Sequence, residues 1–400
     1  MPSDQTRPSL GQIAPALRGL LAVASGDDDS PWRTVILTAL TDPEALAYAA
    51  HPELAEPTEG APARGCPAPI PLERPALFAA APVDPETPRQ WRESLAQALE
   101  QYRAQHGARP QVVALKDLGL LYVAEEATAQ GGPPLENRVA LVTGAGGAIG
   151  HGICAGLLAQ GAHVAAADLS EESLKHLVGE FEQPYPGRIL SVLMDVTNEA
   201  SVTRGFAQVC AQWGGVDIVV INAGIAHVAA LTELPLETFQ KLERVNVEGT
   251  LLSLAEAARV MQLQGTGGDM VLVSTKNVFA PGARFGAYSA TKAAAHQLAR
   301  IASLELAEFG IRVNMVAPDG VFSDGQRKSG LWAAVGPDRM KARGLDEQGL
   351  EEYYRNRNLL KARVTAKHVA NAVLFFVTRQ TPTTGATIPI DGGLPEATPR

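Results

Sequence analysis

The segment from Val139 to Gly150 constrains the fold of this chain more than any other. An apolar run, 139–142, leads directly into Thr-Gly-Ala-Gly-Gly-Ala-Ile-Gly at 143–150, which opens a helical pattern. A buried strand that ends in such a turn collects backbone N–H groups at the positive N-terminal end of the next helix, and glycines keep side chains out of the way. The segment therefore predicts a strand–turn–helix unit with a pyrophosphate site. Taken alone, a tight turn without a ligand is an equally good interpretation.

An acidic residue at the end of the next apolar run favours the ligand site over a simple turn. Asp168 closes the run 163–168, which predicts a second buried strand. A carboxylate at this place accepts hydrogen bonds from an adenosine ribose and repels a 2′-phosphate. Because no Lys or Arg follows Asp168 directly, we predict that the cofactor is NAD rather than NADP.

Two further apolar runs, 189–194 and 216–221, predict the third and fourth strands of the same sheet. The residues that follow them, and that we expect to lie beside the adenine and its ribose, are Asp195, Val196, Asn222, Ala223 and Gly224. The alternatives are a helix N-cap for Asp195 and a simple turn for 222–224.

Tyr288 and Lys292 lie one turn apart on a helical pattern, so they share a face of the helix. A phenol whose pKa is near 10 is a poor base at neutral pH. A nearby ammonium and a positive nicotinamide ring lower that pKa, so that Tyr288 can take the proton of a substrate hydroxyl while hydride leaves the same carbon. An ordinary amphipathic helix is the alternative, and the hydroxyl groups of Ser274 and Thr275, just after the apolar run 270–273, favour catalysis.

In order and spacing, these residues resemble the short-chain dehydrogenase/reductase family over about residues 137 to 393. The resemblance implies a Rossmann-like, doubly wound parallel sheet of seven strands and assembly into a homodimer or homotetramer. It implies Tyr288 as general acid/base, and Lys292 as the residue that holds the nicotinamide ribose and tunes Tyr288. It also implies that Asn246 holds a water in a proton relay. Thr275 stands where the family usually has its catalytic serine, and its spacing favours it over Ser274 as the residue that orients the substrate.

The same resemblance gives the full set of cofactor contacts, to which Tyr288 and Lys292 also belong. They are Gly144, Gly146, Ala148, Ile149, Gly150, Asp168, Asp195, Val196, Asn222, Ala223, Gly224, Pro318 and Val321. Ala148 and Asp319 stand where glycines are usual in the family. Ser274 and Asn277 are further candidates for substrate contacts.

Residues 1–135 differ in composition from the rest: 18 of the 28 prolines lie there, so 52–62 and 64–69 cannot form regular secondary structure. The runs 34–37 and 111–115 nevertheless predict strands. Residues 88–106 carry apolar side chains at helical spacing, namely Trp91, Leu95, Leu99 and Tyr102. We predict a smaller N-terminal α/β subdomain.

Together, the two regions resemble bifunctional class II aldolase/short-chain dehydrogenase proteins, the rhamnulose-phosphate aldolase/alcohol or lactaldehyde dehydrogenases. The matching stretches are the Cys66-Pro67 loop, the helix 91–103, the strand and turn 112–121, and Ser-Thr-Lys-Asn at 274–277. The resemblance implies a non-catalytic aldolase remnant at 1–135 and a dehydrogenase domain at 136–400. Only His51 and His106 precede the dehydrogenase half, and a metal needs at least three protein ligands, so we predict no metal site.

Residues 319–364 form a long excursion beyond the sixth strand, where dehydrogenases of this type place substrate contacts, and we expect it to close over the substrate. Candidates to line a polar pocket are Trp332, Tyr353, Tyr354 and Arg355. Arg355, Arg357 and Lys361 are candidates to hold a phosphate. The alternative, which we favour, is a solvated helix face with ordinary i, i+4 ion pairs.

The net charge of −9 argues against nucleic acid as a partner, and no run of 18 apolar residues indicates a membrane span. We expect a cytoplasmic, NAD-dependent oxidoreductase. Its small-molecule substrate is a polyol, sugar, sugar phosphate or hydroxyaldehyde that reacts at a secondary alcohol or its carbonyl. The alternative is a catalytically silent protein that binds NAD as a structural or sensory ligand, which only the threonine at 275 favours.

Overall fold

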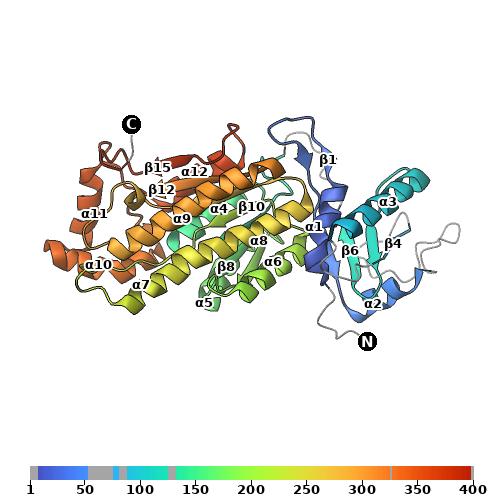
Figure 1. Ribbon diagram of the computed structural model, residues 1–400, viewed down its shortest axis with the longest axis horizontal. Coiled ribbons are helices and arrows are strands. Elements are labelled where there is room, and N and C mark those ends of the chain that lie inside the picture. The colour runs from blue at the N-terminus through green and yellow to red at the C-terminus, as the bar shows by residue number, and fades with distance from the viewer. Residues whose placement is uncertain (1–7, 53–74, 81–87, 125–131, 325–326, 398–400) are drawn as a thin grey trace. The chain divides into compact units, whose positions relative to one another are not determined.

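The computed structural model of this chain describes residues 8–52, 75–80, 88–124, 132–324 and 327–397 (Figure 1). Segment 64–69, with the Cys66-Pro67 loop, and nearly all of 52–62 lie outside the described residues. The chain divides into two compact units. Unit 1 comprises Met1–Gly131, Phe206–Val216 and Arg259–Thr266, and unit 2 comprises Gly132–Gly205, Asp217–Ala258 and Gly267–Arg400. The assignment of 1–135 as an aldolase remnant stays a prediction.

Unit 1 contains a four-stranded sheet of order β3-β6-β5-β4, in which only β4 and β5 are parallel. Its elements up to residue 131 are α1 (Leu10–Leu21), β1 (Val23–Ala24), β2 (Trp32–Arg33), β3 (Leu37–Leu40), α2 (Pro43–Ala50), β4 (Leu77–Ala79), α3 (Pro88–His106), β5 (Val112–Leu115) and β6 (Gly119–Val123). The predicted helix 88–106 is confirmed. Trp91, Leu95 and Leu99, spaced along one face of α3, share a buried cluster with Leu17 of α1.

The strand predicted at 34–37 is wrong in its bounds, because pairing in β3 starts only at Leu37. The Val35 carbonyl accepts a hydrogen bond from Arg18 Nε (2.6 Å), and the Ile36 carbonyl accepts one from the Ala124 N–H (3.0 Å). At Val35 the buried guanidinium of Arg18, and not a neighbouring strand, donates the hydrogen bond to the backbone carbonyl. Local periodicity does not reveal this contact.

Unit 2 contains a seven-stranded parallel sheet of order β15-β12-β11-β10-β7-β8-β9, so the predicted doubly wound sheet is confirmed. Its elements are β7 (Val139–Thr143), α4 (Ala148–Ala159), β8 (His163–Asp168), α5 (Glu171–Phe181), β9 (Ile189–Leu193), β10 (Ile218–Ile221), α7 (Leu236–Glu243), the π-helical turn η2 (Arg244–Glu248), β11 (Gly268–Val273), η3 (Lys276–Val278), α9 (Gly286–Glu305), η4 (Ala307–Phe309), β12 (Ile311–Pro318), β13 (Ser323–Asp324), β14 (Arg327–Lys328), α10 (Gly330–Arg343), α11 (Glu347–Arg357), α12 (Ala366–Val377) and β15 (Thr387–Ile390). The helices α6 (Glu199–Trp213) and α8 (Gly249–Gln264) have residues in both units.

Alternation along the strands sends side chains to both faces of this sheet. One face shares a buried cluster with α4, α5 and α12, to which Val142 and Val271 contribute from the central strands. The helices α8 and α9 cross in front of the strands in Figure 1, over the other face. The strand order reverses direction between β7 and β10, and doubly wound sheets bind ligands at that point, beyond the carboxyl ends of the strands.

At the opposite ends of the strands, the buried carboxylate of Asp269 links three segments of unit 2. Asp269 stands in β11 and accepts hydrogen bonds from Arg312 Nη2 of β12 (2.6 Å) and from Arg379 Nε just after α12 (3.0 Å). The Asp269 side chain is 3% exposed. Because two guanidinium groups share one carboxylate away from water, removing the carboxylate would leave uncompensated positive charge.

We therefore expect Asp269→Ala to lower the free energy of unfolding by about 3–5 kcal/mol, measured by urea denaturation. The matched control is Glu351→Ala, which breaks the partly exposed ion pair between Glu351 and Arg363 and should cost less than about 1 kcal/mol. Equal losses of unfolding free energy in the two variants would contradict the stabilising role of the buried ion pairs of Asp269.

Candidate active site

A pocket of about 900 Å³ lies where the turns after β7, β10, β11 and β12 meet, at the upper end of the volumes usual for ligand sites. Most of the predicted site residues line it: Gly144, Ala148, Ile149, Gly150, Asp168, Asn222, Ala223, Gly224, Ser274, Thr275, Asn277, Tyr288, Lys292, Pro318 and Val321. Gly146, Asp195, Val196 and Asn246 are not in its lining. The pocket thus brings together residues that lie far apart in the sequence.

The glycine-rich turn is fixed to the end of β10 by side-chain and backbone hydrogen bonds. Asn222 Nδ2 donates to the carbonyl oxygens of Thr143 (3.0 Å) and Gly144 (2.9 Å), and Thr143 Oγ1 accepts from the Ala223 N–H (3.0 Å). Gly144 has φ +63°, and a Cβ there would lie 2.8 Å from Ala223 Cα. This approach requires glycine, and it turns the start of α4 toward the pocket.

The turn and Asp168 fit the phosphate and ribose groups of a dinucleotide. The N-cap residue of α4 is Gly147, which offers no side-chain hydrogen bond to the first turn of the helix. The N-terminal end of α4 is therefore available to an anion. Asp168 Oδ2 accepts from the Gly146 N–H (2.9 Å) and Oδ1 from the Ser170 N–H (2.9 Å). These bonds orient the carboxylate, and each oxygen keeps a lone pair for a ribose hydroxyl.

Tyr288 and Lys292 lie on the buried face of α9, as their spacing predicts. Lys292 Nζ donates to the Val273 carbonyl oxygen (3.0 Å) at the end of β11. Burial raises the pKa of Tyr288 to about 12, although a hydrogen bond with Thr275 acts in the opposite direction. Burial also lowers the pKa of Lys292 to about 8. Burial outweighs the hydrogen bond with Thr275, so the pKa of Tyr288 lies above its ordinary value.

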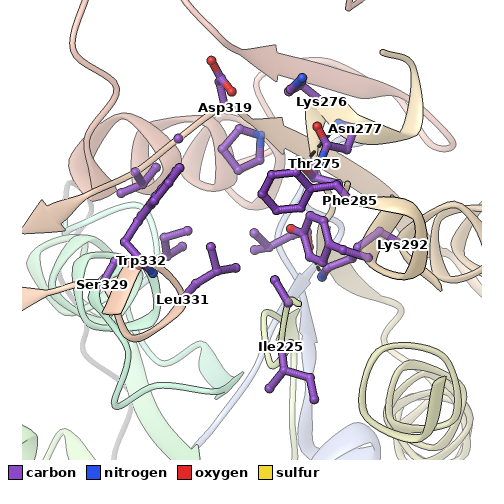
Figure 2. Close-up of a pocket in the computed structure, with 18 of the residues that line it drawn as sticks. Ile225, Thr275, Lys276, Asn277, Phe285, Lys292, Asp319, Ser329, Leu331 and Trp332 are labelled. Atoms are coloured by element: carbon purple, nitrogen blue, oxygen red, sulfur yellow. Dashed lines mark hydrogen bonds between the residues drawn. The ribbon is translucent and has the colours of Figure 1, made fainter. Parts of the chain in front are cut away.

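The two candidate hydroxyl groups have different surroundings. Thr275 is hydrogen-bonded to Tyr288, whereas Ser274 Oγ lies 3.0 Å from His296 Nδ1 and is hydrogen-bonded to that ring. Burial, and to a smaller extent the charge of Arg300, lowers the pKa of His296, which favours the neutral imidazole. The geometry therefore pairs Thr275 with the general acid/base and engages Ser274 elsewhere. Figure 2 shows Thr275 on the same side of the pocket as Lys292.

Asn246 lies in the π-helical turn η2 and is fully buried. Its Oδ1 accepts from the Ile225 N–H (2.9 Å), and its Nδ2 donates to the Ile225 carbonyl oxygen (2.9 Å) and to Thr291 Oγ1 (3.0 Å). The side chain thus ties the loop after β10 to α9. This bonding supports a positioning role, and the water relay stays a prediction.

Asp195 stabilises a turn, and Val196 contacts a helix. Asp195 Oδ1 accepts from the Thr197 N–H (2.9 Å) and hydroxyl (2.7 Å) ahead of α6. Val196 packs on α8, where a Cβ at Gly249 would lie 2.8 Å from Val196 Cγ2. Their contacts with adenine stay predictions.

The excursion 319–364 contributes Trp332, Tyr353, Tyr354 and Arg357 to the pocket, as expected, but not Arg355 or Lys361. Arg355 is exposed, and Lys361 Nζ donates to the Asn356 carbonyl oxygen. Further lining residues, which were not among the predicted contacts, include Lys276, Arg284, Phe285, Arg339 and Arg343. A signal for Lys276 was present, because it stands between two predicted substrate contacts. None marked Arg339 or Arg343, since the buried face of α10 depends on packing.

Asp319 stands where the related family usually has a glycine, and its partner explains the substitution. Arg357 Nη2 of α11 donates to Asp319 Oδ2 (2.6 Å) and also to Oδ1. The carboxylate thus anchors the end of α11 beside the pocket. Figure 2 shows Asp319 and Lys276 at the same end of the pocket.

Among the described residues, no group of three or more His, Cys, Asp or Glu side chains is arranged to hold a metal ion. The described helices include none that is both long and apolar enough to cross a membrane.

The family model for short chain dehydrogenase matches residues 138–334. The uncharacterized oxidoreductase YuxG of Bacillus subtilis is 39% identical over 263 residues, which are 65% of this chain and 38% of that protein. This chain therefore spans well under half of the length of that relative. The sorbitol dehydrogenase of Cereibacter sphaeroides is 34% identical over 197 residues, or 49% of this chain and 75% of the relative.

Among solved structures, the sorbitol-6-phosphate 2-dehydrogenase of Erwinia amylovora superimposes with a TM-score of 0.60 and 30% sequence identity. The alignment covers 64% of this chain and 98% of that structure. A complete dehydrogenase of this type thus corresponds to about two thirds of the chain.

The lowered pKa of Lys292 has a consequence for stability. Below pH 8 the folded and unfolded chains both carry this ammonium, and the folded chain bears the cost of burying it. Between pH 8 and 10.5 Lys292 keeps its proton only in the unfolded chain. The destabilisation caused by burying the ammonium therefore decreases as pH rises. We expect Lys292→Met to raise the free energy of unfolding of the cofactor-free protein at pH 7 by roughly 1–3 kcal/mol, with a smaller gain at pH 9.5.

Urea denaturation at pH 7 and 9.5 checks this expectation, and Lys241→Met on the exposed side of α7 is the control without a pH-dependent gain. A loss of stability at pH 7 in Lys292→Met would show that its bond to Val273 outweighs desolvation.

Proposed function

The chain belongs to the short-chain dehydrogenase family, and we propose that it is a NAD-dependent oxidoreductase of a small polyol, sugar or hydroxyaldehyde. The observation that carries this proposal is the burial of Thr275, Tyr288 and Lys292 together in a pocket that Asp168 and the start of α4 also line. Relatives named for sorbitol and sorbitol 6-phosphate support a polyhydroxylated substrate with a secondary alcohol.

The proposed reaction is the reversible oxidation of a CH–OH group. A bound nicotinamide ring supplies the acceptor for the hydride, which carries both electrons away from the carbon. Thr275 holds the substrate oxygen beside Tyr288. As the hydride leaves, the Tyr288 phenolate takes the hydroxyl proton and the C=O bond forms. In the reverse direction the Tyr288 phenol returns this proton to the carbonyl oxygen.

Burial sets the resting state of this acid/base. With a pKa of about 12, Tyr288 in the cofactor-free chain is a phenol, the form that protonates a carbonyl. Oxidation needs the phenolate, and the hydrogen bond from Thr275 favours it only in part. The positive charges of Lys292 and of an oxidised nicotinamide ring supply the remaining stabilisation. A bound oxidised nicotinamide would therefore favour the active base.

The proposed preference for NAD rests on Asp168. Its carboxylate lines the pocket and is fixed by two backbone N–H groups, so it can accept from ribose hydroxyls without rearranging. A 2′-phosphate at the same place would bring two negative groups together.

We also propose that the protein is a cytoplasmic homodimer or homotetramer in which residues 1–135 have no catalytic part. Exposed apolar side chains on α8 and α9 support such assembly, among them Leu251, Ile301 and Leu304.

The proposal is tested by NAD reduction on a panel of polyols, aldoses and lactaldehyde. Tyr288→Phe should abolish turnover and leave NAD binding within about twofold, because only the phenol proton is removed. Asp168→Ala should weaken NAD binding about tenfold or more, the usual loss for a hydrogen bond to a charged group, and should relax the discrimination against NADP. A wild-type protein that binds NAD but turns over no substrate would favour the silent, NAD-binding alternative.

Thr275→Val removes the hydroxyl at nearly constant shape and should lower kcat about a hundredfold, as the loss of one polarising donor does. Ser274→Ala is the matched control and should cost far less, since its hydroxyl is bonded to His296. Steady-state kinetics on one substrate compares the two variants. The reverse ranking would move the orienting role to Ser274.

A further inference from the structure

The wall of the pocket that α10 and α11 supply carries an unusual concentration of positive charge. Among the described residues that line the whole pocket, the cations are Lys276, Arg284, Lys292, Arg339, Arg343 and Arg357, and the carboxylates are Asp168 and Asp319. Asp319 is paired with Arg357, and Arg284 with Glu233. Lys292 belongs to the catalytic group. Three cations, Lys276, Arg339 and Arg343, have no ion-pair partner among the carboxylates of the described residues.

Arg339 is the least expected member of this set. Its side chain is buried, with 6% of the residue exposed, and Nε has no hydrogen-bond partner within the described part of the chain. Arg339 Nη2 lies 3.2 Å from Tyr354 Oη, and Cζ stacks 4.7 Å from the centroid of Phe285. An aromatic face and one hydroxyl do not compensate a buried guanidinium. The Arg339 guanidinium therefore lacks a compensating negative charge within the described part of the chain.

Aromatic rings also hold Arg343, which is hydrogen-bonded to Tyr353, and Arg357, whose Nη2 is bonded to Asp319. Arg343 Cζ lies 4.7 Å from the centroid of Tyr353, and Arg357 Cζ lies 4.1 Å from that of Tyr354. Stacking of this type fixes the guanidinium plane and keeps its donors in the plane. Lys276 Nζ is anchored by the Ala280 carbonyl oxygen (3.0 Å). The four groups are thus positioned before any ligand arrives.

The mutual repulsion of these groups is visible in Lys276. Burial, and then the charges of Arg357 and Arg339, lower its pKa, while the carboxylates of Asp319 and Glu396 act in the opposite direction. The cluster also stands in a chain whose net charge is −9. Positive charge on this wall is therefore a local feature that burial makes costly.

The cluster lies on the substrate side of the pocket. Arg339 stacks on Phe285, and the Phe285 ring contacts the Tyr288 ring edge-on at 6.0 Å between centroids. Lys276 directly follows Thr275 in the chain. Figure 2 shows Lys276, Asp319 and Phe285 around the part of the pocket that Trp332 faces. One aromatic ring separates the acid/base from Arg339, a gap that a short carbon chain can bridge.

We propose that Lys276, Arg339, Arg343 and Arg357 form a subsite for the phosphate ester of the substrate, so that the enzyme acts on a phosphorylated polyol or its carbonyl form. Bidentate guanidinium donors and one ammonium match the oxygens of a phosphate dianion. Even when Asp319 neutralises Arg357, the three remaining groups, Lys276, Arg339 and Arg343, carry more positive charge than one carboxylate of a ligand would neutralise. The inference rests on the proposed dehydrogenase function for the reaction, and on the pocket alone for the anion.

Binding is tested without turnover. The full chain is saturated with NADH, which occupies the turn before α4, and inorganic phosphate is titrated against sodium chloride of equal ionic strength. Phosphate should raise the melting temperature of the wild type, because it binds only the folded chain. Arg339→Gln and Arg343→Gln should each weaken phosphate binding about tenfold or more, measured by calorimetry. Arg355→Gln, an exposed α11 residue outside the lining, is the matched control and should behave like the wild type.

The melting temperature without phosphate separates recognition from structure. Arg339→Gln removes a buried charge without a carboxylate partner, so it should melt at or above the wild-type temperature. A large decrease would assign Arg339 a structural role and would overturn its part in the subsite. Should Arg339→Gln fail to fold, Arg343→Gln and Lys276→Gln carry the same phosphate titration.

Turnover then identifies the substrate class. In the wild type, kcat/KM for sorbitol 6-phosphate should exceed that for sorbitol by about tenfold or more, and Arg339→Gln and Arg343→Gln should lower the ratio of the two kcat/KM values toward one. Equal use of both substrates, or a preference for a carboxylated sugar acid of the same length, would overturn the phosphate assignment while leaving the dehydrogenase function intact. Variant-sensitive phosphate binding without turnover of any substrate would support the subsite and contradict the proposed function instead.

Discussion

The structure of the dehydrogenase unit depends on how closely two backbone segments approach at the carboxyl ends of β7 and β10. Asn222 Nδ2 bonds to two consecutive carbonyl groups of the glycine-rich turn, and a side chain at Gly144 would collide with Ala223. This contact exists because the strand order reverses there, which places β10 beside β7 with no helix between their ends. It sets the direction in which α4 begins, and the pocket forms around it.

Burial decides the chemistry that the pocket can perform. Tyr288 and Lys292 are both withdrawn from water, and desolvation favours the neutral form of each. Burial therefore favours the phenol form of Tyr288, and in the proposed mechanism the positive charge of a bound oxidised nicotinamide would favour the phenolate. The same logic applies to the guanidinium groups of α10 and α11. Burying their positive charge lowers the stability of the folded chain, and the phosphate ester proposed as ligand would supply the compensating negative charge.

The aspartate at position 319, where the family usually has a glycine, is explained by its contact with Arg357, which is distant in the sequence. Aspartate in place of the usual glycine would be unexplained by its neighbours in sequence. In the fold, Asp319 pairs with Arg357 and fixes the end of α11 next to Tyr354, whose hydroxyl in turn meets Arg339. Asp319 therefore links the loop after β12 to α11, and it fixes Arg357, one of the cations that line the pocket.

The sequence by itself determined the parallel sheet, the glycine-rich turn, the acidic residue at the end of β8 and the pairing of Tyr288 with Lys292. Each depends on a period or a spacing within one element or between neighbouring ones, which backbone geometry converts directly into position. The helix α3 was predictable for the same reason. The bounds of β3 were not, because Arg18 from another element bonds the Val35 carbonyl. The different surroundings of Ser274 and Thr275 were not predictable either. The same is true of the convergence of Arg339, Arg343 and Arg357 on one pocket. These depend on which side chains face one another after packing, and contacts between residues distant in sequence leave no local pattern to predict them from.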